Sequence, residues 1–512
     1  METSGKRRFG DLPFCLFWTF FSGLIAHGFA YFNAAFSHDG LYQLAATDDL
    51  FQVSLGRFLQ PAWRFIRGRI SAPWLLGALS LLFIALSAYL VIRLLKLRSP
   101  LWKGFTCALM AVNQTVTLLN ATYVQWVDAF MLAMLLSVLS VWLLDRGGLW
   151  PFLGGVACLA ASMALYQSYV SMALGLMLML FIDRALRGRE EYPPRALFAW
   201  AGRAAAMALL SAALYWGCMQ LALRVSGVAA SQEYNSVVGM LNYPLTEIPL
   251  QVARTYWRFI RLMAIPDAAQ PFRAILMNAL LAALGIFLFL RRVRRTRPGA
   301  LNVLLAVIAA GLLPFALNIS FFLSKDVQHD LMIYAFVLLY LLILQFKERD
   351  EAQEARGRKP LRAAICVALG VVLFTNVMYS NGAYLKKTLE AESFDTLATR
   401  LIDRVEQVEG YVPGETPVAL LGSFAETPLL GENAFAGYRE TGLTERTPIT
   451  YTSVGVSYFH NKLGYNIRFA SAEEIDAHDR DPEVLSMGVF PAADSVKMVD
   501  GCVYVRISPP ED

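Results

Sequence analysis

Charged residues are scarce in this chain of 512 residues. They make up only 17% of it, whereas hydrophobic residues make up 56%. A typical soluble domain is about 25% charged and about 45–50% apolar, so the composition predicts an integral membrane protein. The formal net charge of +5 comes from basic residues that lie between apolar runs rather than on one patch. We therefore expect no nucleic acid partner.

Cysteine is also scarce, with six residues in the whole chain. Five of them lie in or beside apolar runs, and Cys502 alone lies in the polar C-terminal part. A disulfide framework is therefore excluded there. The chain also lacks a small-residue cleavage site after its basic start, Lys6-Arg7-Arg8. We expect an uncleaved first membrane helix rather than a removed signal peptide.

Long apolar runs, by contrast, are abundant. A membrane-spanning helix needs about 20 mostly apolar residues. We find eleven such runs, which predicts an all-α polytopic membrane protein with about eleven transmembrane helices. The runs centre on 13–34, 73–95, 103–120, 127–144, 149–166, 168–184, 198–222, 274–290, 301–323, 330–346 and 362–382.

The basic residues fix an expected orientation for these runs. Lys and Arg gather in every second connection, for example in RRVRRTR at 291–297, whereas the short turn near 121–126 holds none. Cytoplasmic loops carry such an excess of Lys and Arg. We therefore expect a cytoplasmic N-terminus and, because eleven is odd, an extracytoplasmic C-terminal part. This arrangement places the loops 35–72 and 223–272 outside the membrane.

Two domains follow from this division. Residues 1–382 form the predicted multispanning domain, and residues 383–512 form a small extracytoplasmic α/β domain. The expected elements of the second domain are a helix in 393–411, a buried strand at 417–422 and a hairpin over 496–507 around Asp500-Gly501. In the second outer loop, arginines at helical spacing in 251–263 predict an amphipathic helix at the membrane interface. A short additional core helix is the alternative.

Carboxylates gather at the predicted outer rim. Ionisable groups at membrane level are costly in free energy, so they are candidates for function. Asp39, Asp48 and Asp49 lie in the first outer loop, and Asp128 lies at the start of the fourth run. A carboxylate can accept the proton of an attacking hydroxyl. These four residues are therefore the candidate catalytic residues.

Cations and polar groups share this rim. Arginine binds phosphate through a bidentate fork, and a cation suits a phosphate leaving group. A membrane enzyme with these groups could use a lipid-linked sugar phosphate whose tail stays in the bilayer. The candidate substrate-binding residues are His38, Arg57, Arg64, Gln125, Tyr166, Gln167, Lys325 and His329.

Structural explanations stay open for several of these residues. Asp48-Asp49 could cap a helix that follows, and Asp128 could be a helix N-terminal charge. Arg57, Arg64, Arg67 and Arg69 could meet lipid head groups. We assign no metal site, although a hard cation such as Mg²⁺ or Mn²⁺ is an alternative. Its ligands would be His38, Asp39, Asp48 and Asp49.

Three stretches carry a family resemblance. FSHDGLYQLAATDDLFQVSLGRFLQPAWRFIRGRI, then NATYVQWVDAFMLAMLLS, then ALYQSYVSMALGLMLML follow one another in the order typical of the bacterial GtrII-type glucosyltransferases. The sequence resembles that family most clearly over about residues 15–185. The resemblance implies a GT-C-like enzyme that takes a sugar, typically glucose from undecaprenyl phosphate, and transfers it to an envelope glycan at the outer face of the bacterial inner membrane. It also makes Asp39 the best match to the family's loop carboxylate, with Asp48 or Asp49 in reserve and Asp128 as a second acidic position.

Two other activities remain as alternatives. One is an envelope polysaccharide polymerase, for which the arginine-rich loop 223–272 leaves room. The other is a flippase or transporter of lipid-linked sugars. A flippase needs polar groups in both leaflets, whereas the acids here gather on one side, and we find no internal repeat of the kind that transporters show.

Overall fold

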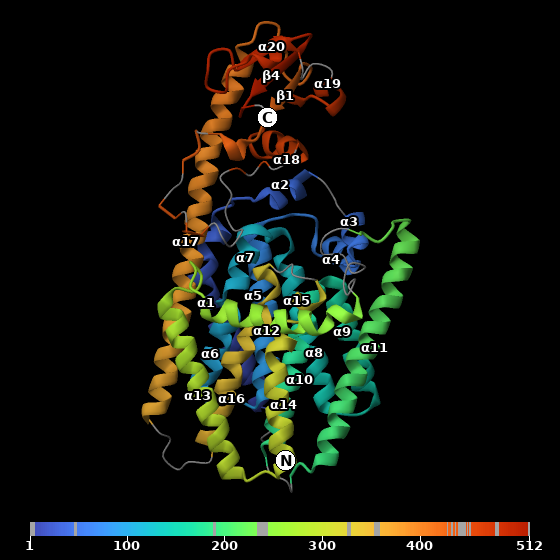
Figure 1. Ribbon diagram of the computed structural model, residues 1–512, viewed down its shortest axis with the longest axis vertical. Helices are drawn as coiled ribbons and strands as arrows, with labels where there is room; N and C mark the ends of the chain where they lie inside the picture. Colours follow the sequence, from blue (N-terminus) through green and yellow to red (C-terminus); the bar gives the residue numbers. More distant parts are fainter. Residues whose placement is uncertain are drawn as a thin grey trace. The chain divides into compact units, whose positions relative to one another are not determined.

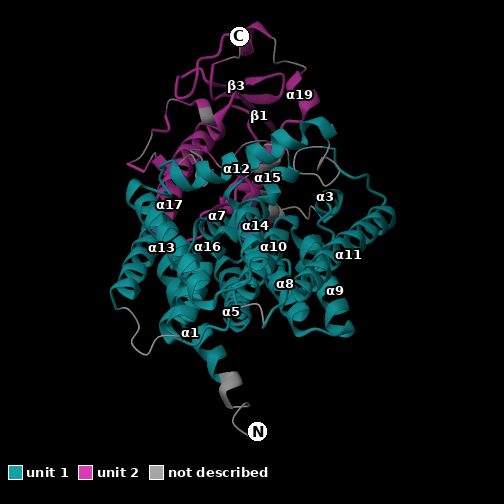
Figure 2. Ribbon diagram, turned by 60° about the horizontal axis from the view of Figure 1, so that its bottom comes forward, with its two compact units in different colours: residues 1–31, 48–120, 126–380 teal, residues 32–47, 121–125, 381–512 magenta. Residues whose placement is uncertain are grey.

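The computed structural model divides into two compact units, which Figure 2 colours teal and magenta. Unit 1 comprises residues 1–31, 48–120 and 126–380, and unit 2 comprises residues 32–47, 121–125 and 381–512. The residues that the structure describes are 6–45, 49–187, 191–232, 244–324, 329–352, 359–427, 429–431, 434–435, 437–438, 447, 449, 452–476 and 481–509.

Unit 1 is a bundle of helices (Figure 1). Two short helices, at 49–54 and 59–67, follow the loop after the first helix. The boundary with unit 2 falls at the end of the helix 6–32 and within the helices 114–122 and 359–406. Its helices are α1 (Lys6–Phe32), α3 (Asp49–Ser54), α4 (Leu59–Arg67), α5 (Pro73–Leu95), α6 (Pro100–Ala111), α7 (Gln114–Thr122), α8 (Val127–Arg146), α9 (Leu149–Leu165), α10 (Val170–Ala185), α11 (Pro194–Ser226), α12 (Ile248–Ala264), α13 (Phe272–Thr296), α14 (Ala300–Leu317), α15 (Ile319–Leu323), α16 (Val337–Glu351) and α17 (Lys359–Glu406).

Eight helices among the described residues are long and apolar enough to cross a membrane, which confirms the polytopic all-α class. The other three of the eleven predicted runs fold as shorter pieces. The run 103–120 breaks after Ala111 into α6 and α7, and 149–166 becomes the 17-residue α9. The run 330–346 opens as two 3₁₀ turns before α16 begins at Val337. Apolar content alone does not reveal the break after Ala111, because hydrogen bonds from the side chain of Asn113 hold it.

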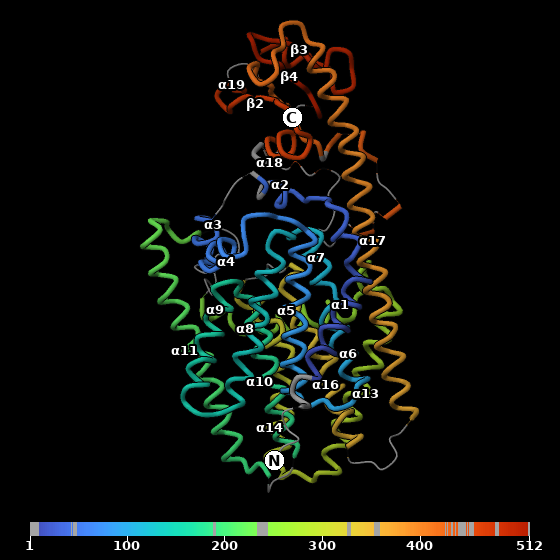
Figure 3. Tube along the Cα trace, turned by 180° about the vertical axis from the view of Figure 1, so that it is seen from behind, coloured from blue at the N-terminus to red at the C-terminus, as the bar shows by residue number. Residues whose placement is uncertain are grey.

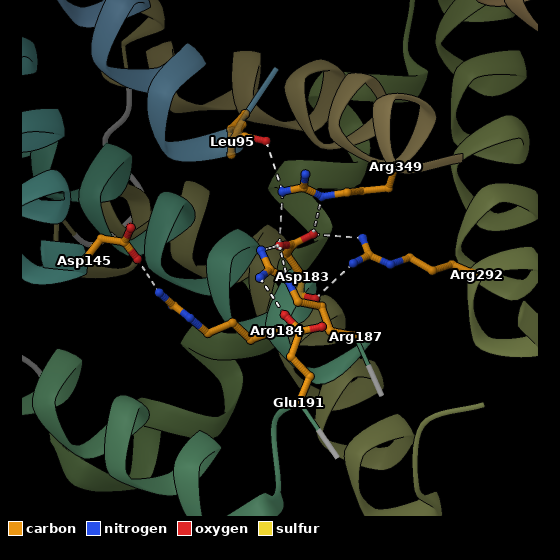
Figure 4. Close-up of polar contacts among 8 residues, drawn as sticks. All are labelled: Leu95, Asp145, Asp183, Arg184, Arg187, Glu191, Arg292 and Arg349. Carbon is orange, nitrogen blue, oxygen red and sulfur yellow. Dashed lines mark hydrogen bonds and ion pairs between the residues drawn. The ribbon is translucent and has the colours of Figure 1, made fainter. Parts of the chain in front are cut away.

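Four helices of unit 1 meet at their C-terminal ends around one buried carboxylate, Asp183 of α10 (Figure 4). Ion pairs join it to Arg187 at 2.7 Å, Arg292 of α13 at 2.9 Å and Arg349 of α16 at 3.2 Å. Arg349 also donates to the carbonyl oxygen of Leu95 in α5, at 3.3 Å. A buried carboxylate needs such partners. The alternation of basic loops in the sequence therefore corresponds to a shared end of the bundle.

The helix predicted over 251–263 is present as α12, which runs across α14 in Figure 1. Its buried residues are polar, and the carbonyl oxygen of Thr255 accepts a hydrogen bond from Asn318 Nδ2 at 2.9 Å. Leu250, Trp257 and Ile260 are at least half exposed. This outward apolar face is what a helix at a membrane interface presents.

Unit 2 contains a four-stranded sheet of order β2-β1-β4-β3. Figure 3 labels three of its strands, β2, β3 and β4. The predicted hairpin is confirmed: β3 and β4 pair antiparallel, and Asp500 (φ 45°) and Gly501 (φ 81°) form the turn that such a hairpin needs. The predicted strand at 417–422 is also confirmed, as β1. The strands are β1 (Pro417–Leu421), β2 (Arg468–Phe469), β3 (Val496–Val499) and β4 (Cys502–Arg506).

The core of unit 2 also anchors the helix α2 (His38–Ala45). Leu41 of α2 is fully buried in one cluster with Phe394, Tyr458 and Val503. Helix α2 packs against α18 (Thr452–Ser457), and Figures 1 and 3 show the two helices side by side. The first predicted outer loop is therefore shared: its start belongs to unit 2, and its remainder belongs to unit 1.

Candidate functional site

A break in the chain at Gly56 positions the first candidate residue, Arg57. Gly56 has φ 80°, a conformation that favours glycine, and it separates α3 from α4. Two side chains hold the break: Tyr215 donates to the Gly56 carbonyl oxygen at 3.1 Å, and Gln167 donates to that of Leu55 at 2.9 Å. Helix α3 begins at Asp49, where the capping explanation expected a helix to begin, but it ends at Ser54 and does not extend to Arg57. Gln167 serves here to fix the backbone.

Neutral groups surround the guanidinium of Arg57. Its Cζ lies 5.0 Å from the ring centroid of Tyr166, and its Nη1 donates to Gln52 Oε1 at 3.5 Å. Its Nε is buried without a hydrogen-bond partner among the described residues, and no carboxylate among them lies within ion-pair distance. A partly buried cation held in this way favours an anionic ligand.

Asp128, by contrast, is already bound within the protein. It is fully buried in the first turn of α8, as the helix N-terminal explanation predicted. Its Oδ2 lies 3.0 Å from Arg67 Nε and accepts a hydrogen bond from Trp63 Nε1 at 2.8 Å. Burial lowers the pKa of Arg67, and the negative charge of Asp128 opposes that change. Asp128 thus links α8 to α4.

Asp49 and Arg64 lie together on α3 and α4. Asp49 is 3.8 Å from Arg64 and 3.9 Å from Arg69, both longer than a hydrogen bond. The guanidinium of Arg64 also lies 5.7 Å from the Trp126 ring. Two further candidates, Asp48 and Lys325, lie outside the described residues.

Three candidates belong to unit 2. His38 and Asp39 open α2, with His38 Nε2 3.4 Å from Asp39 Oδ1 and the Asp39 side chain 35% exposed. Gln125 is buried in the 3₁₀ turn Val124–Trp126. Asp39 is therefore open to solvent on the surface of a helix whose other face is anchored by Leu41. A carboxylate in that position can exchange protons with solvent.

His329 lies directly before the 3₁₀ turn Asp330–Met332 in unit 1. Burial lowers the pKa of His329. Its neighbour Asp330, absent from the predicted site, accepts a hydrogen bond from Gln114 Nε2 at 2.5 Å. Burial raises the pKa of Asp330 to about 6, and Gln114 opposes this change.

The residues that sequence reasoning missed are the partners of the predicted ones. Arg67 and Trp63 hold Asp128, and Tyr215 holds the turn before Arg57. No local spacing relates α4 to α8 or α11, so only the fold reveals these pairs. Among the residues that the structure describes, no group of three or more His, Cys, Asp or Glu could hold a metal ion.

A family model described as "Glucosyl transferase GtrII" matches residues 28–346. Comparison with curated proteins and with solved structures gives no match. The matched segment is more than half of the chain and includes Asp39, Arg57 and Asp128. The resemblance noted in the sequence is therefore confirmed: the chain belongs to the GtrII glucosyl transferase family, as a membrane glucosyltransferase.

Proposed function

We propose that the protein transfers glucose from a polyprenyl-phosphate donor to a cell-envelope glycan, at the outer face of the bacterial inner membrane. The lipid tail of the donor stays in the bilayer, and membrane lipid surrounds the helices of unit 1. The N-terminus is cytoplasmic in this proposal, and the C-terminal part lies outside.

Arg57 is the observation that carries the proposal. Its guanidinium is held by Tyr166 and Gln52, and no described carboxylate neutralises it. A phosphate that leaves with a bond's electron pair gains negative charge, and a preorganised cation stabilises that charge. The two arginines of α4 are bound differently: Arg67 pairs with Asp128, and Arg64 lies near Asp49.

Asp39 is the proposed general base. It takes the proton of an acceptor hydroxyl as the oxygen attacks the anomeric carbon of the donor glucose. The bond between that carbon and the phosphate oxygen breaks, and its electron pair leaves with polyprenyl phosphate. His38, 3.4 Å from Asp39, orients the carboxylate. Asp48 and Asp49, in the same loop as Asp39, and Lys325, four residues before His329 in the sequence, remain proposed contributors to the reaction.

The test is a transfer assay with purified protein in lipid. Polyprenyl-phosphate-glucose is supplied with a panel of envelope glycans, and released polyprenyl phosphate is measured. We expect Arg57→Ala to lower kcat by about 10²–10³, the typical effect of removing one charge-stabilising donor. Arg57→Lys should lower kcat less, because lysine keeps the positive charge but lacks the bidentate hydrogen bonding of the guanidinium. Arg224→Ala, an exposed arginine on α11, is the matched control.

The base is tested in the same assay. Asp39→Asn should lower kcat by about 10²–10⁴, the usual contribution of general base catalysis. Full transfer activity of a correctly folded Asp39→Asn protein would refute this role. Asp49→Asn, measured in parallel, decides whether the second carboxylate of the loop shares it.

A further inference from the structure

Helix α6 ends at a break that separates two hollows of unit 1. Asn113 holds the break: its Nδ2 donates to the carbonyl oxygens of Leu109 and Met110 at 3.2 and 3.1 Å, and its Oδ1 accepts from the Val116 backbone at 3.1 Å. Val112, the residue before it, lines both hollows. The first hollow is lined by apolar groups almost throughout, whereas the second has a mixed lining of apolar and polar side chains. The two hollows meet at Val112.

The apolar hollow is a groove of about 570 Å³ between α1, α6 and α17. Its walls include Phe14, Trp18, Phe105, Leu373 and Val377. Ser22 is the one hydroxyl among the described lining residues, and it donates to the Trp18 carbonyl oxygen at 2.7 Å. Such a groove offers nothing to a polar ligand and fits a hydrocarbon chain.

The mixed hollow is a cavity of about 70 Å³, lined in part by apolar side chains such as Ile333 and Phe336. Its polar lining groups are neutral, among them Gln114, Gln270, Asn278, Tyr340 and Asn376. One of these groups retains unused hydrogen-bonding capacity. Gln270 Oε1 is buried without a partner among the described residues. Asn278 accepts from the Tyr340 hydroxyl at 2.8 Å, and Asn376 reaches the Val112 carbonyl oxygen only at 3.4 Å. Burying an amide group without a hydrogen-bond partner costs free energy, and a ligand that supplies the partner removes that cost.

Charge decides which head group suits the cavity. No charged side chain is among its described lining residues. Charges of both signs flank it. Asp330 accepts a hydrogen bond from Gln114 at 2.5 Å, and Asp267 accepts one from the Gln270 backbone at 2.7 Å. Arg273 donates to Thr375, next to Asn376, at 3.3 Å, and Arg258 interacts with Asp330. The two signs balance, so a phosphate gains no net attraction. Amides and phenols bind hydroxyl groups well, which favours a sugar.

Three tyrosine rings connect the cavity with Arg57. Tyr334 lines the cavity, and its ring centroid lies 5.9 Å from that of Tyr169. Tyr169 in turn lies 5.9 Å from Tyr166, over which Arg57 is placed. These three rings are buried. The cavity and the proposed phosphate site are therefore joined by a continuous row of packed aromatic rings.

We propose that the groove and the cavity together bind one lipid with an uncharged, hydroxyl-rich head group, and that this glycolipid is the acceptor. The chain lies in the groove and part of the sugar lies in the cavity. The acceptor role rests on the proposed function, whereas the binding of the glycolipid does not. The donor is a different ligand, because its phosphate needs a cation and the cavity lining holds none.

Gly104 gives a selective test. It lines the groove, and a side chain there would meet nothing within 4 Å, so Gly104→Phe fills the groove without displacing the backbone. Gly217→Phe on α11 is the matched control, since it too meets nothing within 4 Å and lies outside the groove. Both full-length proteins are placed in nanodiscs. Equilibrium binding of monoglucosyl-diacylglycerol is compared with that of phosphatidylglycerol carrying the same chains.

We expect the wild type to prefer the glycolipid, and Gly104→Phe to weaken its binding about tenfold, the effect of removing roughly two methylene groups from apolar contact. Asn278→Ala should weaken the glycolipid and leave phosphatidylglycerol unchanged. Equal binding of both lipids, or equal effects of Gly104→Phe and Gly217→Phe, would overturn the site.

The acceptor role has its own readout. In the transfer assay, Gly104→Phe should raise KM for the glycolipid acceptor and leave KM for polyprenyl-phosphate-glucose unchanged. A raised KM for the donor instead would assign the groove to the donor chain and overturn the proposal. Binding of the glycolipid with no transfer from any donor would support the site, overturn the acceptor role and count against the proposed function.

Discussion

The ion pair between Arg67 and Asp128 makes a sharp prediction about stability. The two side chains are 3% and 0% exposed, and Arg67 Nε lies 3.0 Å from Asp128 Oδ2. At an effective dielectric constant of about 20, that separation corresponds to an attraction of about 6 kcal/mol, which offsets part of the cost of burying both charges. Arg67→Met leaves Asp128 buried without its cation. We expect a loss of about 3–5 kcal/mol in the free energy of unfolding.

A second substitution separates this effect from lost packing. In Arg67→Met/Asp128→Asn neither charge remains, and the Trp63 hydrogen bond to the retained oxygen is preserved. The double variant should therefore be more stable than Arg67→Met alone by at least about 1 kcal/mol, the lower range of coupling between contacting residues. The assay is unfolding in SDS, followed by helical circular dichroism. The reasoning is refuted if Arg67→Met unfolds within about 0.5 kcal/mol of the wild type, the range of neutral surface changes.

Three further predictions concern other parts of the molecule. Asp183→Asn leaves three arginines around a neutral amide, and it should lower the thermal midpoint more than Asp145→Asn, which removes a single, less buried pair. The pKa of Asp330 in the folded state is about 6, above the ordinary value of 3.8, so between these values the folded state binds more protons than the unfolded state. The stability of the protein should therefore fall as pH rises from about 4 to 6. Asp330→Asn should remove that part of the pH dependence of the thermal midpoint, and an unchanged profile would contradict this prediction. Gly501→Val at φ 81° should destabilise unit 2 by about 1–2 kcal/mol, measured by limited proteolysis of the C-terminal part, whereas Gly431→Val, where φ is not positive, is the control.

Much of the fold follows from composition and local pattern. The eleven apolar runs and the grouping of basic loops depend on short segments, and so does the hairpin around Asp500-Gly501. The break at Asn113 and the turn at Gly56 were not predicted, because hydrogen bonds from side chains and from distant helices hold them. A short stretch of sequence does not indicate that those hydrogen bonds form.

The candidate site was predictable in its residue types but not in its pairings. Arg57, Tyr166 and Gln167 come together with Tyr215, although nothing in the sequence links the first loop to α11. The role of Asp128 depends on Arg67, a residue 61 positions away whose side chain sequence reasoning could as well assign to lipid head groups. Pairing of this kind is set by helix packing, which a single sequence does not specify.

The most direct test of the central claim is the release of polyprenyl phosphate by purified protein supplied with polyprenyl-phosphate-glucose and an acceptor. The account predicts one lipid phosphate released for each glucose transferred, with Arg57→Ala slowing both together and Arg224→Ala slowing neither. Absence of release with every donor and acceptor pair, or undiminished release by a correctly folded Arg57→Ala protein, would contradict it.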